Sequence, residues 1–451
     1  MSATAVAEKS KVLPRHGGFA YPSVESAAGV WLTLTDGRRI LDACSGGSMT
    51  TSLGHGNEAV IAAAEEQGKA LPYSYHHHFT NEPQERLAAE LIERAAPAMA
   101  RVRFTSGGSE ANETALRLIR AYHVERGEAE RTRIISPAQA YHGSLTGTLA
   151  LSGRPALRRD WDPYLAPQPH LAPGAWRRDP SGAESLVALD ALLEEVGPEN
   201  VAAYFCEPVS AAAAPGFSPP DRFWEGLAER SERHGFLICC DEVASGMGRT
   251  GSWFASDPLP FQPDVITTAK GLAAGYAPLA AVLCTGEVYA ALDQGSGDFD
   301  HGHTWDGAPL PCAVGRAVLA ELIAGDLVAR VDAAGGPLLE RLGERLAGLP
   351  IVREVRGKGF LLGVELVDPR DGETPLPAEP DIERRVVELG LEAGVLLAAT
   401  STAGDGFLAD QLVLAPAFTA TEEELEAMVE RTGETIEALE TEVAARLEGR
   451  S

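Results

Sequence analysis

The sequence predicts an α/β fold, with a large domain built on a mostly parallel sheet between helices and a smaller α+β domain. The chain has 451 residues, 45% of them hydrophobic, which is enough for a large core but long for one compact unit. Short β-type runs alternate with helical segments through the first two thirds of the chain, as in βαβ units. Beyond Pro311, long helical patterns replace this alternation.

The N-terminal segment predicts a β-hairpin. Residues 30–35 and 38–41 are β-type runs, and Asp36-Gly37 lies between them. Asp-Gly is a strong signal for a two-residue turn between antiparallel strands. We therefore expect residues 1–49 to belong to the small domain and the large domain to span residues 50–311.

The elements of the large domain follow from local spacing. Leu87, Leu91 and Ile92 have helical spacing and predict a helix between residues 82 and 100, followed by a short strand at 102–105. Such alternation indicates a mostly parallel sheet. Further strands are expected at 133–136, 201–207, 236–241 and 264–268, and helices at 185–195 and 222–234.

The C-terminal part predicts a separate α+β domain over residues 312–451. Helical spacing runs from about residue 313 to 346, and we expect Gly335-Gly336-Pro337 to interrupt it. Two β runs follow within residues 351–367. A late helix is expected to begin at Thr421, because Thr421-Glu422-Glu423-Glu424 has the capping-box pattern.

Composition excludes several classes of partner. With 65 acidic and 38 basic residues the formal charge is -27, so the chain repels phosphate backbones and anionic membrane surfaces, and neither nucleic acid nor membrane is expected as a partner. The six cysteines stand in apolar segments without a C-x-x-C pair, which indicates reduced, buried thiols. Residues 1–11 lack an apolar signal core and no run could span a bilayer, so a cytoplasmic location is expected.

Lys270 is the strongest single indication of function. It ends an apolar β-type run, residues 265–269, and Gly271 follows it. A lysine held out of bulk water loses its proton more easily and can attack a carbonyl to form a Schiff base. A solvated lysine at a strand end is the commoner case, so the neighbouring motifs decide between the two.

A glycine-rich turn opens a helix after the strand at 102–105. Residues 106–112 read Ser-Gly-Gly-Ser-Glu-Ala-Asn, and exposed N–H groups at such a helix start can bind phosphate. Gly108 permits close approach of the backbone and Ser109 adds a hydroxyl donor. The turn lacks the lysine of a nucleotide P-loop and does not fit the dinucleotide spacing. Taken alone, it is equally compatible with an ordinary turn.

Several further polar or aromatic residues follow strands. Asp241 ends a buried strand and needs a cationic partner, which a pyridinium nitrogen would supply. Alternatively, Asp241 could be a helix N-cap or a metal ligand. A metal site is disfavoured because no His/Cys set with ligand spacing accompanies it. Tyr141 stands before His142-Gly143, suited to stacking on a flat ring or to the core. Glu207 ends another strand. His76-His77-His78 indicates a solvated or pocket-edge loop, because three consecutive histidines cannot all face one ion.

These motifs occur in an order that resembles class III aminotransferases. Those are pyridoxal phosphate (PLP) enzymes of fold type I and include ω-amino acid and amine:pyruvate transaminases. The resemblance covers nearly the whole chain. The motifs are S-G-G-S-E-A-N at 106–112, Y-H-G at 141–143, E-P-V at 207–209, D-E-V at 241–243, G-R-T-G at 248–251, A-K-G-L at 269–272 and G-H-T at 302–304.

The resemblance implies a role for each motif residue. Lys270 would hold PLP as a Schiff base and move the substrate proton, and Asp241 would pair with the pyridine nitrogen. Val243 and Tyr141 would contact the two faces of the ring, with His142 in the same cofactor-binding set. Gly108 and Ser109 would bind the phosphate, Thr304 would reach it from a partner subunit, and Glu207 would organise hydrogen bonds on the phenolic side.

The resemblance also implies the reaction and the assembly. A transaminase would move an amino group from an amine or amino acid donor to a keto acid or aldehyde acceptor in two half-reactions, with PLP cycling through pyridoxamine phosphate. Two subunits, or a dimer of dimers, would share active sites. Residues 386–430 contain no Arg or Lys, so the usual clamp for a distal carboxylate is in doubt. The candidate substrate-binding residues are Ser48, Tyr73, Tyr75 and His76.

Other functions remain open at this stage. A PLP-dependent aminomutase, racemase or decarboxylating transaminase would use the same Lys270 and Asp241, and product analysis separates them. A non-enzymatic ligand-binding protein is disfavoured because both of these residues are present and no DNA-binding helix pair precedes the body. A dehydrogenase would require the dinucleotide fingerprint, which is absent.

Overall fold

A seven-stranded sheet forms the centre of the large part of the molecule. The computed structural model describes residues 11–13, 21–172, 180–376, 381–400 and 410–448. Neighbouring strands are parallel from β9 to β6, whereas β10 is antiparallel to both β9 and β4, which confirms the expected mostly parallel sheet. In spatial order the strands are β4 (Met99–Thr105), β10 (Ala280–Thr285), β9 (Val265–Thr268), β8 (Leu237–Glu242), β7 (Val201–Cys206), β5 (Arg133–Pro137) and β6 (His170–Leu171).

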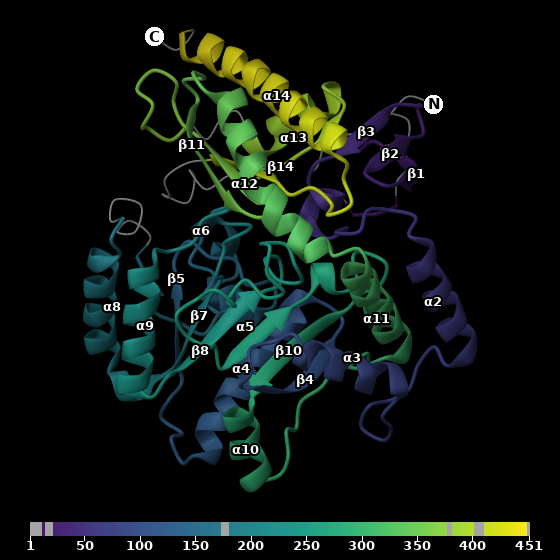
Figure 1. Cartoon of the computed structure of the whole chain (residues 1–451). Helices are drawn as coiled ribbons and strands as arrows, with labels where there is room; N and C mark the ends of the chain where they lie inside the picture. The colour runs from purple at the N-terminus through teal and green to yellow at the C-terminus, as the bar shows by residue number, and fades with distance from the viewer. Residues whose placement is uncertain (1–10, 14–20, 173–179, 377–380, 401–409, 449–451) are drawn as a thin grey trace.

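Helices cover this sheet (Figure 1). Every residue of β7, β8, β9 and β10 is buried, as expected for strands covered on both faces, which therefore read as continuous apolar runs. Helix α4 (Gly108–Glu125) packs across β10, β9, β8 and β7, and α9 (Asp221–His234) packs on β8. The other α-helices among the described residues of this part are α2 (Glu58–Ala70), α3 (Glu82–Ile92), α5 (Thr146–Leu151), α6 (Pro155–Arg158), α8 (Ala183–Val196), α10 (Gly286–Gln294) and α11 (Pro309–Ala324).

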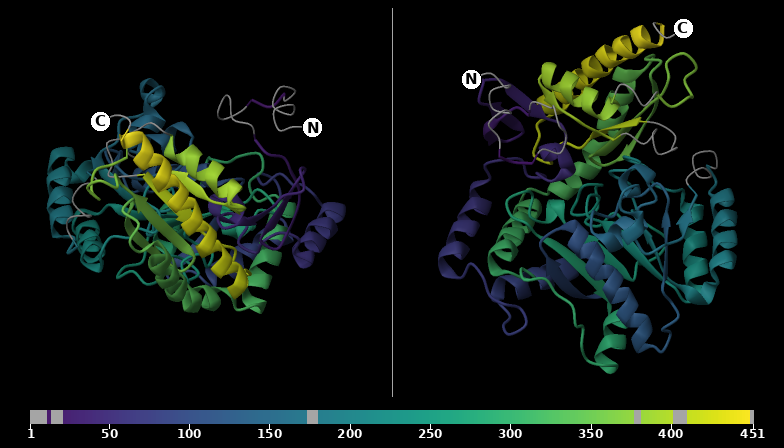
Figure 2. Two further views of the ribbon diagram at one scale, coloured as in Figure 1. Left: turned by 90° about the horizontal axis from the view of Figure 1, so that it is seen from above. Right: turned by 180° about the vertical axis from the view of Figure 1, so that it is seen from behind.

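The N-terminal strands pair with the C-terminal part of the chain. Strands β2 (Trp31–Leu34) and β3 (Arg39–Asp42) form the expected hairpin around Gly37, whose φ is 87°. Strand β1 (Val24–Ala28) pairs with β2, and β3 pairs in parallel with β13 (Val395–Leu396). Figures 1 and 2 show this small sheet beside the C-terminal elements.

A third sheet and three helices make up most of the described C-terminal residues. The sheet is antiparallel, in the order β11 (Val352–Lys358), β12 (Leu361–Leu366), β15 (Asp410–Leu414) and β14 (Ala398–Thr400). Helices α12 (Leu327–Leu346), α13 (Ile382–Glu392) and α14 (Glu422–Glu448) accompany it, and α14 extends along its outer side (Figure 2). The expected capping box is confirmed, because the Glu424 N–H donates to Thr421 Oγ1 at 3.2 Å and the Thr421 N–H donates to Glu424 Oε2 at 2.9 Å.

The expected helix interruption at Gly335-Gly336-Pro337 is wrong. The chain breaks instead between α11 and α12, where Asp326 has a φ of 48°, and α12 continues through Pro337. Gly335 is needed for packing, since a Cβ there would lie 2.5 Å from the Gly359 Cα. The helix expected over 82–100 is also too long, because α3 ends at Ile92 and β4 begins at Met99. Residue 312 lies inside α11, so the domain limits remain a proposal.

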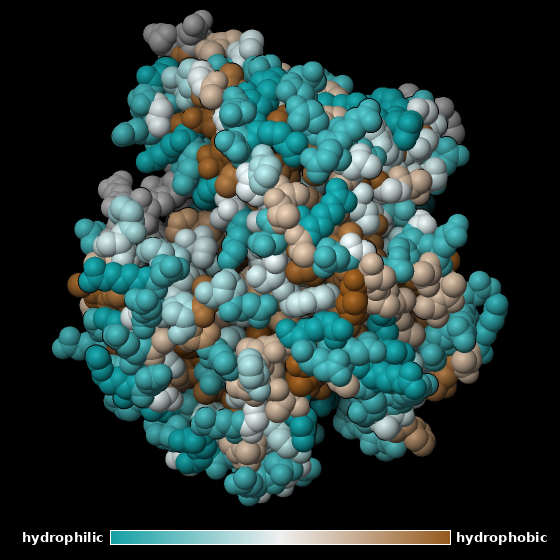
Figure 3. Space-filling view, viewed as in Figure 1, coloured by the Kyte–Doolittle hydropathy of each residue, from teal (hydrophilic) through white to brown (hydrophobic). Residues whose placement is uncertain are grey.

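One face of the molecule is predominantly hydrophilic. The face in Figure 3 shows mostly polar side chains with small hydrophobic areas between them, consistent with the large excess of acidic residues. None of the helices in the described part of the chain is long and apolar enough to cross a bilayer.

Candidate active site

A cavity of about 320 Å³ opens at the carboxyl ends of the central parallel strands. Ligands of α/β sheets bind at this edge, because the loops that follow parallel strands converge there. Most of the sequence-predicted cofactor residues lie on its wall. The lining includes Gly108, Ser109, Tyr141, His142, Glu207, Asp241, Val243 and Lys270, together with Thr50, Asn112, Ala211, Ala212, Ala244 and residues 277–279.

Lys270 presents an amine to this cavity. It directly follows β9 in a short 3-10 turn, Lys270–Leu272, and its side chain is only partly exposed. Burial lowers the pKa of the amine below its ordinary value, although the carboxylates of Asp241 and Glu207 act in the opposite direction. Among the described residues the amine has no hydrogen-bond or ion-pair partner. The neutral, nucleophilic form of Lys270 is therefore favoured over that of a solvated lysine.

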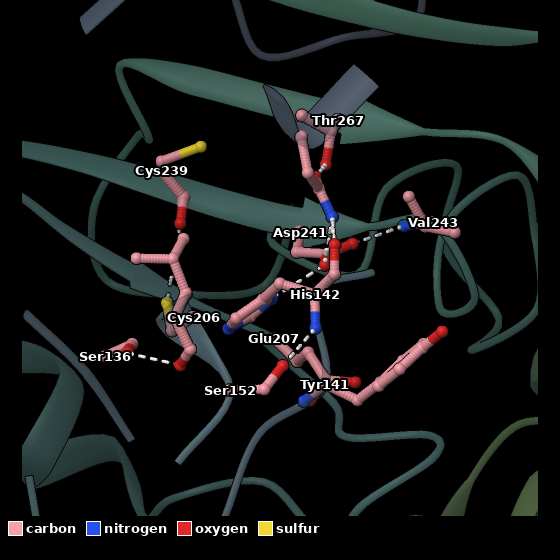
Figure 4. Close-up of polar contacts among 12 residues, drawn as sticks. Ser136, Tyr141, His142, Ser152, Cys206, Glu207, Cys239, Asp241, Val243 and Thr267 are labelled. Carbon is pink, nitrogen blue, oxygen red and sulfur yellow. Dashed lines mark hydrogen bonds and ion pairs between the residues drawn. The ribbon is translucent and has the colours of Figure 1, made fainter. Parts of the chain in front are cut away.

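Asp241 lies beside this lysine as a buried, fully hydrogen-bonded carboxylate. Its exposed fraction is 5%. Oδ2 accepts from His142 Nδ1 at 2.8 Å and Asn112 Nδ2 at 2.7 Å, and Oδ1 accepts from the Val243 N–H at 3.0 Å. Figure 4 shows His142 and Val243 approaching Asp241 from different sides. Because a carboxylate only accepts, His142 carries its hydrogen on Nδ1, and this network fixes the direction of the Asp241 side chain.

Asn112 is a functional residue whose role the sequence did not predict. It is buried in α4, where Nδ2 donates to Asp241 Oδ2 and to the His142 carbonyl oxygen, each at 2.7 Å, and Oδ1 accepts from Thr267 Oγ1 at 2.6 Å. One amide thus holds α4, β9 and the loop after β5 against the carboxylate. The available signal was its place in the S-G-G-S-E-A-N motif, one helical turn beyond the glycines.

The glycine-rich turn places the start of α4 at the cavity. A Cβ on Gly108 would lie 2.6 Å from Val243 Cγ1, so no larger residue fits there without movement. A Cβ on Gly143 would lie 2.6 Å from Ser109 Oγ, and that hydroxyl accepts from the Ser144 N–H at 3.2 Å. The N-terminal N–H groups and dipole of an 18-residue helix therefore lie on the wall of the cavity, where they favour an anion.

Glu207 joins two loops on another wall of the cavity. Its carboxylate accepts from the Ala211 N–H at 3.1 Å, the Ser210 hydroxyl at 3.2 Å and the Tyr141 N–H at 3.4 Å. Burial raises the pKa of this carboxyl above its ordinary value. Glu207 therefore holds the backbone of Tyr141 in place, next to the Asp241 network (Figure 4).

The cavity is chemically suited to PLP. An amine complements an aldehyde, an anionic carboxylate complements a protonated ring nitrogen, and a helix start with two glycines and a serine complements a phosphate. The chain supplies these three groups as Lys270, Asp241 and Gly108-Ser109, which all line the same cavity. The described side chains therefore fit the cofactor that the sequence resemblance implied.

Five predicted residues lie away from this cavity. Ser48 is exposed, and its hydroxyl contacts that of Thr50, which does line the cavity, at 2.9 Å. Tyr73 donates to the Thr304 carbonyl oxygen at 2.9 Å. Thr304, Tyr73, Tyr75 and His76 form a separate group of contacts on two neighbouring loops, and none of them is on the cavity wall.

Comparison with known proteins gives one consistent result. A family model described as "Aminotransferase class-III" matches residues 14–436. The chain is 31% identical to the uncharacterized aminotransferase YodT of Bacillus subtilis, over 93% of this chain and 96% of that protein. It is 34% identical to the putrescine–pyruvate aminotransferase of Pseudomonas aeruginosa over 76% of each. The PLP-bound structure of an amine transaminase from an uncultivated Pseudomonas species is 31% identical, with a TM-score of 0.88 over 95% of this chain and 99% of that one.

Proposed function

The chain belongs to the class III aminotransferase family, and we propose that Lys270 is the residue through which it binds PLP and transfers amino groups. Membership of the family makes it a PLP-dependent transaminase that takes an amine donor and a keto acid acceptor. The observation that carries the assignment to Lys270 is its place on the cavity wall with a lowered amine pKa and the buried carboxylate of Asp241 nearby.

The side chains divide the work of the reaction between them. When bound, PLP supplies an electron-withdrawing ring that stabilises negative charge on the substrate carbon that loses its proton. Asp241 provides the negative charge that keeps a ring nitrogen protonated, and His142 and Asn112 hold that carboxylate in place. Lys270, as a neutral amine, takes the substrate proton and returns it. Tyr141 and Val243, which both line the cavity, would contact the two faces of a bound ring.

The choice of donor is part of the proposal. Among the described residues that line the cavity, Lys270 is the one lysine, no arginine is present, and several of the others are alanines. Together with the absence of Arg and Lys from residues 386–430, this favours an amine without a distal carboxylate as the donor. Pyruvate, another keto acid or an aldehyde serves as the acceptor.

We also propose a homodimer with shared sites and a cytoplasmic location. The dimer is supported by the position of Thr304, which lies on a loop away from the cavity of its own chain although its G-H-T motif resembles an active-site motif. The location is supported by six cysteines that are all buried and unpaired, since disulfides are rare in the reducing cytosol.

Reduction of the holoenzyme with borohydride, followed by peptide mapping, tests the assignment to Lys270. The expected result is one cofactor adduct on the peptide that contains Lys270. Lys270→Ala should lose transamination of amines with pyruvate, whereas Lys69→Ala, on the exposed face of α2, should retain it. An adduct on another side chain, or full activity of Lys270→Ala, would refute the proposal. Product analysis separates transamination from aminomutase, racemase or decarboxylation chemistry.

A further inference from the structure

We infer that Arg103 is a positioning residue that fixes the loop carrying Thr304 and thereby sets how tightly the other subunit of the dimer binds PLP. The inference rests on the proposed function, since the homodimer and the role of Thr304 belong to it. The two loops concerned, residues 73–81 and 301–307, are called the paired loops below. Neither reaches the cavity of its own chain.

Arg103 closes the base of the second loop. It extends from β4, where Nε donates to Asp306 Oδ2 at 3.2 Å and Nη2 donates to the His301 carbonyl oxygen. One guanidinium thus connects the two ends of the segment 301–306. Asp306 is 2% exposed and its Oδ1 has no hydrogen-bond partner among the described atoms, so Arg103 provides its main charge compensation.

The same guanidinium also reaches the first of the paired loops. Nη2 lies 3.2 Å from His76 Nε2. Burial and the neighbouring Arg103 lower the pKa of His76, so its ring is neutral and can accept this hydrogen bond. A Cβ on Gly302 would lie 2.6 Å from both atoms, which shows how closely the loop backbone covers the contact. Arg103 therefore holds both loops in a fixed relation.

Further contacts join the paired loops but leave their tip exposed. Tyr73 donates to the Thr304 carbonyl oxygen at 2.9 Å, and Asn81 Nδ2 donates to the Gly307 carbonyl oxygen at 2.8 Å. Thr304 is exposed, and Trp305 has an exposed fraction of 57%. An ordered base with an exposed hydroxyl at its tip is the arrangement needed to present Thr304 to a second chain without an entropy cost on binding.

The first experiment measures PLP binding to the apo dimer by fluorescence titration. Arg103→Gln should raise the Kd for PLP about tenfold, equivalent to about 1.4 kcal/mol. Arg101→Gln is the matched control, because Arg101 lies on the same strand but its side chain donates to the Ala100 carbonyl oxygen and packs over the Tyr289 ring, away from the paired loops; its Kd should stay within about twofold of wild type. Arg103→Lys should recover part of the affinity, since one ammonium cannot span Asp306 and the His301 carbonyl. Equal Kd values for both glutamine variants would overturn the inference.

A double-mutant cycle tests whether Arg103 acts through Thr304. If it does, Arg103→Gln should weaken PLP binding in the wild-type background but add nothing to Thr304→Ala. If instead the fold changes in Kd of Arg103→Gln and Thr304→Ala multiply in the double variant, Arg103 acts by another route and the inference is overturned. Light scattering of the apo proteins at micromolar concentration should give the dimer mass for every variant. A monomeric Arg103→Gln would also overturn it, because loss of the interface would then explain the weaker binding.

Two controls separate this inference from folding and from the proposed function. Arg103→Gln leaves Asp306 buried without its partner, so Arg103→Gln/Asp306→Asn removes both charges together and should fold with the same weakened Kd for PLP. A wild-type Kd for that pair would count against a positioning role. The proposed function fails if borohydride does not label Lys270, whereas this inference fails if Lys270 is labelled and the Arg103 variants bind PLP normally.

Discussion

At the scale of single residues, the site depends on groups that would be costly to bury alone. Asp241 is tolerated at 5% exposure because three donors reach it, and an unpaired buried carboxylate would be strongly unfavourable. No lysine or arginine among the described residues forms an ion pair with Asp241. The carboxylate therefore keeps a negative charge available for a cationic ligand, which a salt bridge within the protein would have neutralised.

Asp241→Asn tests this availability of charge. The change keeps the size of the side chain but removes the charge that, in the proposed function, keeps the ring nitrogen protonated, so kcat/KM for an amine with pyruvate should fall by about 100-fold or more. Asp190→Asn, an exposed partner of Arg230 on the surface, should leave kcat/KM near wild type. Circular dichroism should be unchanged in both, and both rates are measured at saturating PLP so that weaker cofactor binding does not account for the difference. A nearly normal rate for Asp241→Asn would remove the charge argument.

The sequence predicts these residues because each one follows a strand or opens a helix. Lys270, Asp241 and Glu207 stand at the ends of neighbouring parallel strands, so their order along the chain implies convergence at one edge. Thr50 and residues 277–279 were not predicted, because their loops reach the cavity only through long-range packing. Tyr73, Tyr75 and His76 were named as substrate-binding candidates but lie off the cavity wall of their own chain, because linear spacing does not indicate how a loop packs against the rest of the fold.

At the scale of elements, the start of α4 shows how a motif can constrain packing as well as binding. Gly107 and Gly108 are adjacent, yet a Cβ on Gly107 meets nothing within 4 Å whereas one on Gly108 meets Val243 at 2.6 Å. Val243 is β-branched and cannot turn away easily. We therefore expect Gly108→Ala to lower the free energy of unfolding of the apoprotein by about 1–3 kcal/mol, while Gly107→Ala changes it by less than about 0.5 kcal/mol.

Urea unfolding of the two apoproteins checks this difference. The absence of cofactor in the experiment separates the packing of Val243 from any contact with phosphate. Equal stability of Gly107→Ala and Gly108→Ala would show that Val243 yields, and the close approach of α4 to the loop after β8 would then have no structural role.

The edge of the central sheet contains a histidine that should make stability depend on pH. His170 on β6 accepts from Arg158 at Nε2, 2.7 Å away, and its Nδ1 lies 3.2 Å from Ser136 Oγ, whose own hydrogen goes to the Leu151 carbonyl oxygen. The ring must therefore be neutral, with its hydrogen on Nδ1. Burial, and then Arg158, lower the pKa of His170 from 6.5 to about 4.

Because the pKa of His170 is lower in the folded protein than in the unfolded chain, His170 contributes to the free energy of unfolding above pH 6.5. This contribution is lost as the pH falls toward 4. Wild type should therefore lose about 1–2 kcal/mol more unfolding free energy than His170→Gln between pH 7 and pH 5. Urea unfolding of wild type and His170→Gln at both pH values measures this difference. The effects of the other histidines cancel, because both proteins contain them. Parallel losses in the two proteins would mean that His170 does not titrate in this range.

Local patterns predicted most elements but failed where packing overrides propensity. The hairpin around Gly37 and the capping box at Thr421 are confirmed because each depends on contacts within a few residues. Helix α12 continues through Pro337 and packs closely on the turn at Gly359. Local patterns do not predict this, because the packing is a long-range contact. A Gly-Gly-Pro sequence therefore marks close packing of α12 here, although the same residues usually end a helix.

At the scale of the whole molecule, one buried arginine joins three parts of the chain. Arg249 is 1% exposed and has no carboxylate partner among the described residues. It donates to the carbonyl oxygens of Phe360 at 3.2 Å and Pro416 at 2.5 Å and to Ser45 Oγ at 3.1 Å. Burial lowers the pKa of Arg249 to about 10, so it stays charged at neutral pH.

Arg249→Met should lower the free energy of unfolding by about 3 kcal/mol, because methionine fills much of the space but leaves three buried acceptors without a donor. Arg384→Met removes a side chain that is 47% exposed and pairs with Glu388 within α13, so it should cost less than about 0.5 kcal/mol. Urea unfolding measures both, and hydrogen exchange should report faster opening around Pro416 only in Arg249→Met. Since Ser45, Phe360 and Pro416 come from the N-terminal and C-terminal parts, equal stability of the two variants would mean that the Arg249 side chain contributes little to holding those parts to the rest of the molecule.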